Sequence, residues 1–223
     1  MPDDVPSTIS SMRRDYRAGS LVRTDLDPSP ILQFAKWFDQ AAKSGIREPN
    51  ALTLSTVGLD GTPTARTLLM KDFDERGVTI YTNYTSRKAK ELAANPKASL
   101  LFFWKELERQ VQVRGSVEKV SKAESEAYFF SRPYNARIGA WASQQSDPIP
   151  DREWLTQRIA EFQERFPDTG EKDCVPLPDF WGGYVVAPVS VEFWQGQPGR
   201  NHDRFVYSRQ DGSDEWTLER WSP

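Results

Sequence analysis

The central part of the chain alternates between short apolar runs and polar, turn-forming residues. Apolar runs lie at residues 67–70, 78–81 and 99–104, and residues 111–120 alternate apolar and polar positions with a period of two. Short apolar runs bounded by turn formers, and strict alternation, are typical of β-strands. We therefore predict that residues 66–114 form a β-meander that contains one short helix and is able to close.

Apolar residues spaced three and four apart predict helices elsewhere. The clearest helix covers residues 29–45, where Ser29 is a candidate N-cap, Pro30 suits the first turn and Gly45 ends the pattern. Shorter helices are expected after Ser86 and after Ser121, and a long amphipathic helix is expected over residues 151–166.

More strands are expected on either side of this central part. The predicted strands are 51–57 and 64–70 around a turn at 60–61, then 181–188 and 189–196, and a last hairpin over 203–221 that turns at Asp211-Gly212. The sequence thus predicts a mainly β fold with flanking helices. We expect a flexible N-terminal segment over residues 1–20 and a single domain over residues 21–223.

The composition limits the cellular compartments and the binding partners that are to be expected. The 29 basic and 32 acidic residues give a net charge of −3, so no global positive field attracts nucleic acid or an anionic membrane. The single Cys174 forms no internal disulfide, the N-terminus lacks the pattern of a signal peptide, and no apolar run is long enough to span a bilayer. We therefore predict a cytoplasmic protein that binds neither nucleic acid nor membranes.

Cations cluster near the predicted strand ends and at one helix start. Arg87 and Lys88 fall in the first turn of the helix that follows Ser86, where the helix dipole disfavours positive charge unless an anion is bound. Together with Arg66, Lys71 and Arg109 they indicate a site for an anionic ligand such as a phosphate. For any one of these cations, protection of a strand edge stays an equally good explanation.

Several common sites are missing from the sequence. It contains neither a GxGxxG nor a GxxxxGK[ST] motif, no serine lies in a GxSxG motif, and the single Cys and single His exclude a Cys/His zinc site. We expect no metal site. Taken alone, His202 reads as a surface loop residue, and the segment with Arg13, Arg14 and Tyr16 reads as a solvated turn of helix.

Longer segments resemble the pyridoxine 5′-phosphate oxidases over nearly the whole chain. The resembling segments are EPNAL at 48–52, RTLLMK at 66–71, YTNYTSRKAKELAANP at 81–96, LERQVQVRG at 107–115, YFFSRP at 128–133, IGAWASQQS at 138–146, WGGY at 181–184 and EFWQG at 192–196. The resemblance implies an FMN-binding split β-barrel that works as a homodimer, with FMN and the active sites at the subunit interface. It also implies oxidation of pyridoxine or pyridoxamine 5′-phosphate to pyridoxal 5′-phosphate by O2, with release of H2O2, and of ammonia from the amine.

The resemblance also implies which residues bind each ligand. The cofactor-binding positions would be Arg66, Thr67, Leu68, Leu69, Met70, Lys71, Tyr81, Thr82, Ser86, Arg87, Lys88, Gln110, Gln145, Ser146, Trp194 and Arg204. The substrate-binding positions would be Arg13, Arg14, Tyr16, Lys71, Tyr128, Arg132, Ala136, Arg200 and His202. Of these, Arg200 and His202 are the expected catalytic residues: they would hold the pyridine ring, and His202, Arg200 or water would accept a proton.

The chain departs from the family pattern at a few positions. Ala136 stands where the family has a serine that binds the substrate phosphate, and Asn201 stands between Arg200 and His202 where the family has leucine. We expect the departures at Ala136 and Asn201 to change the affinity for the substrate. Trp221 replaces a leucine of the family and is expected to affect only packing. Two alternatives stay open: a related split-barrel flavin oxidase acting on another aromatic compound, as in phenazine biosynthesis, and a flavin- or pyridoxal-phosphate-binding carrier without turnover.

Overall fold

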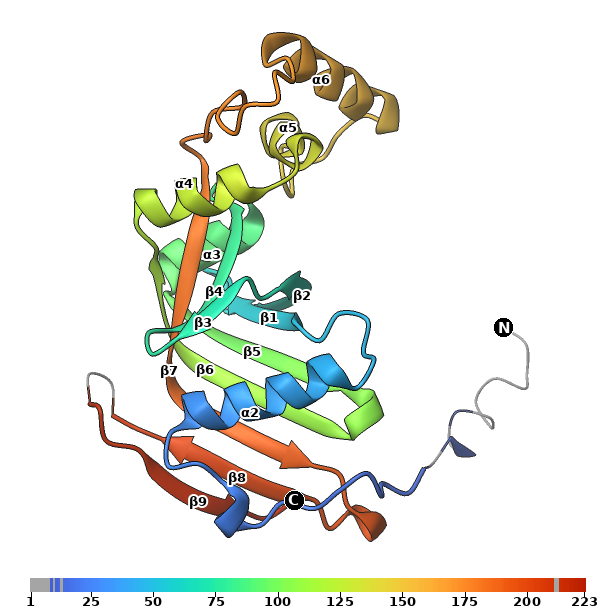
Figure 1. The fold of residues 1–223 in the computed structure, drawn as a ribbon, viewed down its shortest axis with the longest axis vertical. Helices are drawn as coiled ribbons and strands as arrows, with labels where there is room; N and C mark the ends of the chain where they lie inside the picture. Colours follow the sequence, from blue (N-terminus) through green and yellow to red (C-terminus); the bar gives the residue numbers. More distant parts are fainter. Residues whose placement is uncertain (1–8, 10, 13, 211–212) are drawn as a thin grey trace. The chain divides into compact units, whose positions relative to one another are not determined.

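The computed structural model describes residues 9, 11–12, 14–210 and 213–223, so Arg13 and the predicted turn at Asp211-Gly212 lie outside the described residues. The strands are β1 (Ala51–Val57), β2 (Pro63–Leu69), β3 (Asp72–Asp74), β4 (Gly77–Asn83), β5 (Lys97–Trp104), β6 (Arg109–Lys119), β7 (Trp181–Gln195), β8 (Asp203–Ser208) and β9 (Thr217–Trp221). The helices are α2 (Pro30–Lys43), α3 (Arg87–Ala94), α4 (Lys122–Ser131), α5 (Tyr134–Ala142) and α6 (Arg152–Arg165), with 3-10 turns η1 (Arg23–Asp25), η2 (Lys105–Leu107) and η3 (Pro198–Arg200). The predicted mainly β fold with flanking helices is confirmed (Figure 1).

The strands pair in an order that the sequence did not reveal. They follow β2-β1-β5-β6-β7-β4-β3, with β8 paired to β7 and β9 to β8. The hairpin of β1 and β2 is confirmed, but the predicted continuous meander over residues 66–114 is wrong, because β4 pairs with β3 and β7 and not with β2 or β5. A local apolar pattern identifies a strand but carries no information on a partner 100 residues away.

The segments 181–188 and 189–196 form one strand, β7, instead of the two that were predicted. β7 pairs with β4 through residues 181–186 and with β8 through residues 190–195. Pro188, which has no N–H to donate, lies between these two ladders. The proline therefore marks a change of partner inside a continuous strand.

The chain divides into two compact units. The first unit combines Met1–Pro49, Leu101–Val113 and Ser190–Pro223, and the second combines Asn50–Leu100 and Arg114–Val189. Each unit is therefore assembled from separated parts of the sequence. The boundary at residue 20 and the single domain over residues 21–223 stay predictions.

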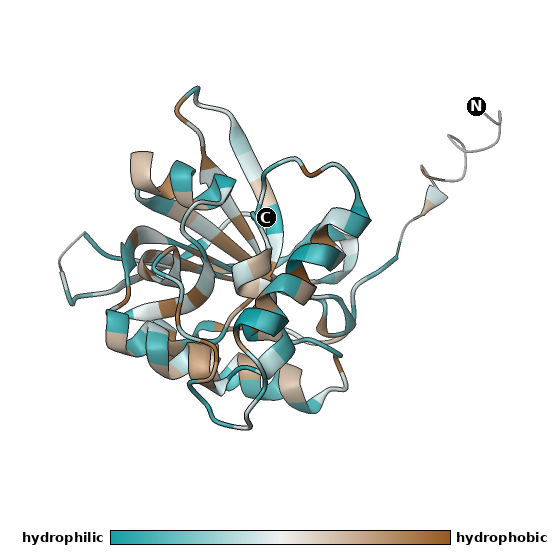
Figure 2. Ribbon diagram, turned by 90° about the horizontal axis from the view of Figure 1, so that it is seen from above, coloured by the Kyte–Doolittle hydropathy of each residue, from teal (hydrophilic) through white to brown (hydrophobic). Residues whose placement is uncertain are grey.

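The first unit is built around α2. Ser29 accepts the Leu32 N–H at 3.4 Å, as expected of an N-cap, and Pro30 occupies the first turn. The apolar stripe of the helix buries Phe34 and Trp37, whose rings lie 5.0 Å from that of Phe102 and 5.2 Å from that of Phe193, respectively. Figure 2 shows polar (teal) and apolar (brown) residues along the helices. It also shows apolar residues along the strands.

The second unit carries the remaining helices. Ser121 and Glu124 form a reciprocal capping box at the start of α4, and Asp151 caps α6. No helix was predicted over residues 134–142, where α5 forms and buries Ile138 in a cluster with Phe129, Val175 and Trp181. None of the described helices is both long and apolar enough to cross a membrane.

Candidate active site

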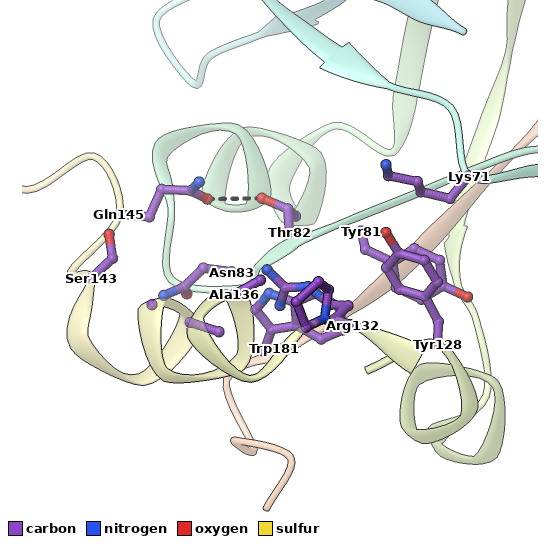
Figure 3. A pocket seen from close by; sticks show the side chains of 13 residues that line it. Lys71, Tyr81, Thr82, Asn83, Tyr128, Arg132, Ala136, Ser143, Gln145 and Trp181 are labelled. Atoms are coloured by element: carbon purple, nitrogen blue, oxygen red, sulfur yellow. Dashed lines mark hydrogen bonds between the residues drawn. The ribbon is translucent and has the colours of Figure 1, made fainter. Parts of the chain in front are cut away.

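The second unit contains a cavity of about 570 Å³, which we call the tyrosine cavity. It brings together the C-terminal part of β4, the end of α4 and one side of α5 (Figure 3). Its lining residues are Lys71, Tyr81, Thr82, Asn83, Tyr128, Arg132, Pro133, Ala136, Gly139, Ala140, Ser143, Gln145 and Trp181. It thus gathers predicted substrate-binding and cofactor-binding residues from segments up to 74 residues apart in sequence, from Lys71 to Gln145.

Stacked aromatic rings form one wall of the tyrosine cavity. The rings of Tyr81 and Tyr128 lie 4.0 Å apart at 20°, and those of Tyr128 and Trp181 lie 6.1 Å apart at 8°. Trp181 was part of a resembling segment but was not predicted as a site residue; as a tryptophan at the start of a strand it gave no local signal of a ligand. This wall offers flat apolar surfaces next to charged groups.

Arg132 brings an unsatisfied positive charge to the same cavity. Its guanidinium lies 4.8 Å from the centroid of the Trp181 ring, and its buried Nη1 has no hydrogen-bond partner among the described residues. Burial lowers the pKa of Arg132, although a guanidinium stays charged. A buried donor without a partner is costly, so Arg132 is suited to bind an anion in this cavity.

Lys88 lies beside the tyrosine cavity and forms no ion pair with any acidic residue that the structure describes. The side chain is only 6% exposed, and Nζ donates to Thr82 Oγ1 at 3.1 Å, to Gln145 Oε1 at 3.0 Å and to Ser86 Oγ at 3.3 Å. Burial, helped by the charge of Arg66 and opposed by that of Glu91, lowers the pKa of Lys88 to about 8. Three predicted cofactor-binding residues, Thr82, Ser86 and Gln145, thus surround the buried ammonium group of a fourth, Lys88.

Arg66 and Arg87 share a buried carboxylate, that of Glu91. Glu91 Oε2 accepts from Arg66 Nη2 at 3.1 Å, and Oε1 accepts from Arg87 Nε at 2.9 Å. Burial alone would raise the pKa of Glu91, but hydrogen bonds from Thr56, Thr64 and the two arginines hold it at about 2. Glu91 was not among the predicted site residues, although its spacing of four from Arg87 on a helix is a recognisable signal of an ion pair.

Ser86 occupies the N-cap position of α3, but the predicted capping bond is absent. Its side chain accepts no backbone N–H and binds Lys88 instead. The first backbone N–H groups of α3 therefore have no side-chain cap. An uncapped helix start next to cations favours an anion.

The first unit contains a cavity of about 540 Å³, which we call the histidine cavity. Its lining residues are Met12, Arg14, Asp15, Tyr16, Gln110, Trp194, Gln197, Gly199, Arg200 and His202. The predicted catalytic residues Arg200 and His202 are thus brought together with residues from the N-terminal segment. Arg200 has a φ of 62°, which is unusual for a residue with a side chain.

His202 is held between aromatic rings. The centroid of its ring lies 4.6 Å from that of Trp194 and 5.5 Å from that of Tyr16. Burial and the charge of Arg200 lower the pKa of His202, while Asp203 opposes the shift. The Gln197 N–H donates to His202 Nδ1 at 3.1 Å, so the neutral imidazole carries its proton on Nε2.

Other predicted site residues lie outside both linings. Thr67, Leu68 and Leu69 belong to β2. Met70 is buried and donates its N–H to Asn50 O at 2.9 Å. Ser146 follows Gln145 and has a φ of 76°. Arg204 Nε donates to Glu192 Oε1 at 2.6 Å, and Nη1 donates to Ser222 O at 2.8 Å. Their assigned roles stay predictions.

Comparisons with known proteins agree on one family. The family model described as pyridoxamine 5′-phosphate oxidase matches residues 38–166, and that described as pyridoxine 5′-phosphate oxidase C-terminal dimerisation region matches residues 181–223. A pyridoxine/pyridoxamine 5′-phosphate oxidase of Ralstonia pickettii is 52% identical over 97% of this chain and 100% of that protein. Another, of Rubrobacter xylanophilus, is 49% identical over the full length of both.

Solved structures support the fold. PhzG from Burkholderia lata, solved in complex with tetrahydrophenazine-1-carboxylic acid, has a TM-score of 0.83 and 31% identity over 91% of this chain and 98% of that one. A pyridoxamine 5′-phosphate oxidase-related, FMN-binding protein from Nostoc punctiforme has a TM-score of 0.69 and 19% identity over 89% and 100%. The predicted split-barrel fold is confirmed. On its fold and on its similarity over almost its full length, the chain belongs to the pyridoxine/pyridoxamine 5′-phosphate oxidase family.

Proposed function

We propose that the protein is an FMN-dependent oxidase that converts pyridoxine and pyridoxamine 5′-phosphate to pyridoxal 5′-phosphate. O2 would be the final electron acceptor, with release of H2O2, and of ammonia from the amine substrate. The observation that carries the proposal is the tyrosine cavity, where Lys71, Tyr128 and Arg132 meet beside stacked aromatic rings. This is a suitable environment for a planar ligand that bears a phosphate.

The substrate phosphate would bind to Lys71, Tyr128 and Arg132. The unpartnered Nη1 of Arg132 supports this assignment, since a phosphate oxygen would supply the missing acceptor. The guanidinium would act as a planar fork and Lys71 as a compact charge. Holding the phosphate orients the substrate relative to the cofactor, which is the main contribution expected from the protein.

FMN fits the group formed by Arg87, Lys88 and the start of α3. The three donors of Lys88 bind only neutral oxygens, so a phosphate would replace one of these bonds, and the side chain of Arg87 is 65% exposed and accessible to a phosphate. Thr82, Ser86 and Gln145, which now bind Lys88, would hold the same ligand. Bound FMN would supply the two-electron acceptor for oxidation at C4′ of the substrate.

Arg200 and His202 would hold the pyridine ring. Their position in the histidine cavity with Tyr16 and Trp194 supports a common role in positioning. Because His202 Nδ1 accepts the Gln197 N–H, we assign its Nε2 as a hydrogen-bond donor to the substrate. Water is then the better candidate for proton acceptance than His202.

We also propose a homodimer with FMN at the subunit interface. The match of residues 181–223 to a dimerisation region supports the dimer. The family resemblance, which implies FMN and the active sites at the subunit interface, supports a site that draws on both subunits.

The similarity to PhzG favours a second candidate, oxidation of another aromatic compound in the same cavity. Ala136, which lines the tyrosine cavity, lacks the hydroxyl that the family uses for the phosphate, and this also favours a different substrate. The presence of Lys71, Tyr128, Arg132 and Arg200 argues for the phosphorylated substrate instead.

A steady-state assay separates these functions. We expect FMN-loaded protein to form pyridoxal 5′-phosphate and an equal amount of H2O2 from pyridoxine 5′-phosphate, and far less product from pyridoxine. Turnover of a tricyclic aromatic compound without turnover of the phosphates would support the second candidate. Binding of pyridoxal 5′-phosphate without any peroxide release would identify a carrier.

A further inference from the structure

Glu108 connects the N-terminal segment to the first unit. Its Oε2 accepts the backbone N–H of Arg17 at 2.6 Å and that of Ala18 at 2.7 Å, across 91 and 90 residues of sequence. Its own carbonyl oxygen accepts the Gly196 N–H at 2.8 Å. One residue therefore holds the N-terminal segment with its side chain and the end of β7 with its backbone.

The backbone of Glu108 is in a conformation that residues with side chains rarely adopt. It ends η2 in the left-handed region, with φ 53° and ψ 40°. Glycine or asparagine would fit this position at lower cost. A glutamate here is unfavourable for the turn itself, which indicates that its carboxylate has another role.

The anchored segment supplies part of the histidine cavity. Arg14, Asp15 and Tyr16 line this cavity, and the ring of Tyr16 packs edge-on against Trp194 at 5.7 Å. Gly196 leaves room for this ring, since a Cβ on Gly196 would lie 2.7 Å from Tyr16 Cγ.

Residues 14–17 belong to no helix or strand, so contacts with the rest of the unit must fix their position. On the C-terminal side, Gln197 Nε2 donates to Gly19 O at 2.6 Å. Of the hydrogen bonds described for residues 14–19, those from residues 17 and 18 to Glu108 lie next to Tyr16 in sequence.

We propose that Glu108 is a positioning residue that holds Arg14 and Tyr16 at the histidine cavity and thereby sets the affinity for the phosphorylated substrate. This inference rests on the proposed function. Among the described residues, the Glu108 carboxylate binds the backbone of residues 17 and 18 and no predicted ligand-binding side chain. Its loss should therefore affect substrate binding more than the chemical step.

The test compares Glu108→Gly and Glu108→Gln with the control Glu106→Gln, all as FMN-loaded proteins. Glycine suits the left-handed backbone and removes the whole side chain with its carboxylate, whereas glutamine keeps the size and removes the charge. Glu106 is an exposed glutamate in the neighbouring turn η2 and lines neither cavity.

For Glu108→Gly we expect the KM for pyridoxine 5′-phosphate to rise about tenfold, because two bonds to a charged acceptor are lost. The kcat and the affinity for FMN should change much less. Glu108→Gln should show a smaller rise in KM, and Glu106→Gln should match the wild type. If Glu108→Gly does not fold, the KM of Glu108→Gln decides.

Limited trypsin digestion gives a second measurement that needs no turnover. The N–H of the Arg17–Ala18 peptide bond donates to the Glu108 carboxylate, which holds this bond in place. Trypsin should therefore cleave it faster in both Glu108 variants. Unchanged cleavage, or faster cleavage with an unchanged KM, would overturn the inference. Failure of the proposed function would appear differently, as absent turnover in the wild type while the digestion still reports on the anchor.

Discussion

The predicted site cations fall into two groups that the sequence could not separate. Arg66 and Arg87 bind the carboxylate of Glu91, whereas the buried Lys88 and the half-buried Arg132 form no ion pair with a described acidic residue. All four were predicted from the sequence to bind a ligand. The position of Arg87 and Lys88 at a helix start identified them as a candidate anion site. Burial and hydrogen bonding depend on side chains from distant segments, such as Gln145 beside Lys88, and no local pattern predicts them.

The lowered pKa of Lys88 predicts a pH-dependent affinity for FMN. Burial brings this pKa from 10.5 to about 8, so Lys88 loses its charge as the pH rises through about 8. If the FMN phosphate binds the charged form, the dissociation constant of FMN should increase above that pH, by up to about tenfold per pH unit.

A fluorescence titration of FMN at several pH values measures this effect. Lys88→Met should bind FMN more weakly at neutral pH and lose the dependence above about pH 8. An equally steep dependence in that variant would assign the titration to another group.

Ala136→Ser restores the hydroxyl that the family has at this position of the tyrosine cavity. A hydrogen bond to a charged phosphate contributes about 1.5–3 kcal/mol, or roughly tenfold in affinity, and a water already bound there would reduce the gain to a few-fold. Because the phosphate is held alike in ground and transition states, KM should fall while kcat stays nearly constant. Steady-state kinetics with saturating FMN measures both constants, and an unchanged KM would contradict a phosphate next to residue 136.

At the scale of elements, the sequence predicted most strands and helices but not how they pair. β1, β4, β5, α2 and α6 lie close to their predicted ranges, because periodicity and capping residues are local signals. The pairing of β4 with β7 and the continuity of β7 through Pro188 depend on contacts between distant segments. Helix α5 was missed because no capping side chain marks its start: Pro133 occupies its N-cap position, whereas Ser121 caps α4 and Asp151 caps α6.

The close approach of β6 to β7 predicts a strict requirement for glycine at position 115. A Cβ on Gly115 would lie 1.7 Å from Ala187 O, where backbone atoms cannot move away as a flexible side chain would. Gly115→Ala should therefore lower the free energy of unfolding by about 1–3 kcal/mol or more.

Gly139→Ala is the matched control. Gly139 lies within α5 with nothing within 4 Å of its added Cβ, so alanine should stabilise the helix by about 0.5–1 kcal/mol. Thermal unfolding compares the two variants. A Gly115→Ala melting temperature at or above that of Gly139→Ala would contradict the described packing of the strands.

At the scale of the whole molecule, the predicted ligand residues are divided between the two units. Lys71, Tyr128 and Arg132 line the tyrosine cavity of the second unit, and Arg200 and His202 line the histidine cavity of the first. The family resemblance implied all of these residues, but only the structure separates them into two groups. We proposed above that one ligand site draws on both subunits of a dimer.

Mixed dimers of Arg132→Ala and Arg200→Ala test the shared site. If each site combines the tyrosine cavity of one subunit with the histidine cavity of its partner, the mixed dimer has one site with both arginines and should show about half the wild-type activity. Each variant alone should be nearly inactive. Purification with two different affinity tags isolates the mixed dimer, and an inactive mixed dimer would place both arginines of a site in one subunit.

In the proposed reaction, a phosphorylated B6 vitamer transfers electrons to FMN bound to this protein. Anaerobic mixing of the FMN-loaded protein with pyridoxine 5′-phosphate measures this step without O2. We expect the visible absorption band of oxidised flavin to disappear and one pyridoxal 5′-phosphate to form per flavin, while pyridoxine at the same concentration reacts far more slowly. A flavin band that persists with pyridoxine 5′-phosphate would contradict this proposal.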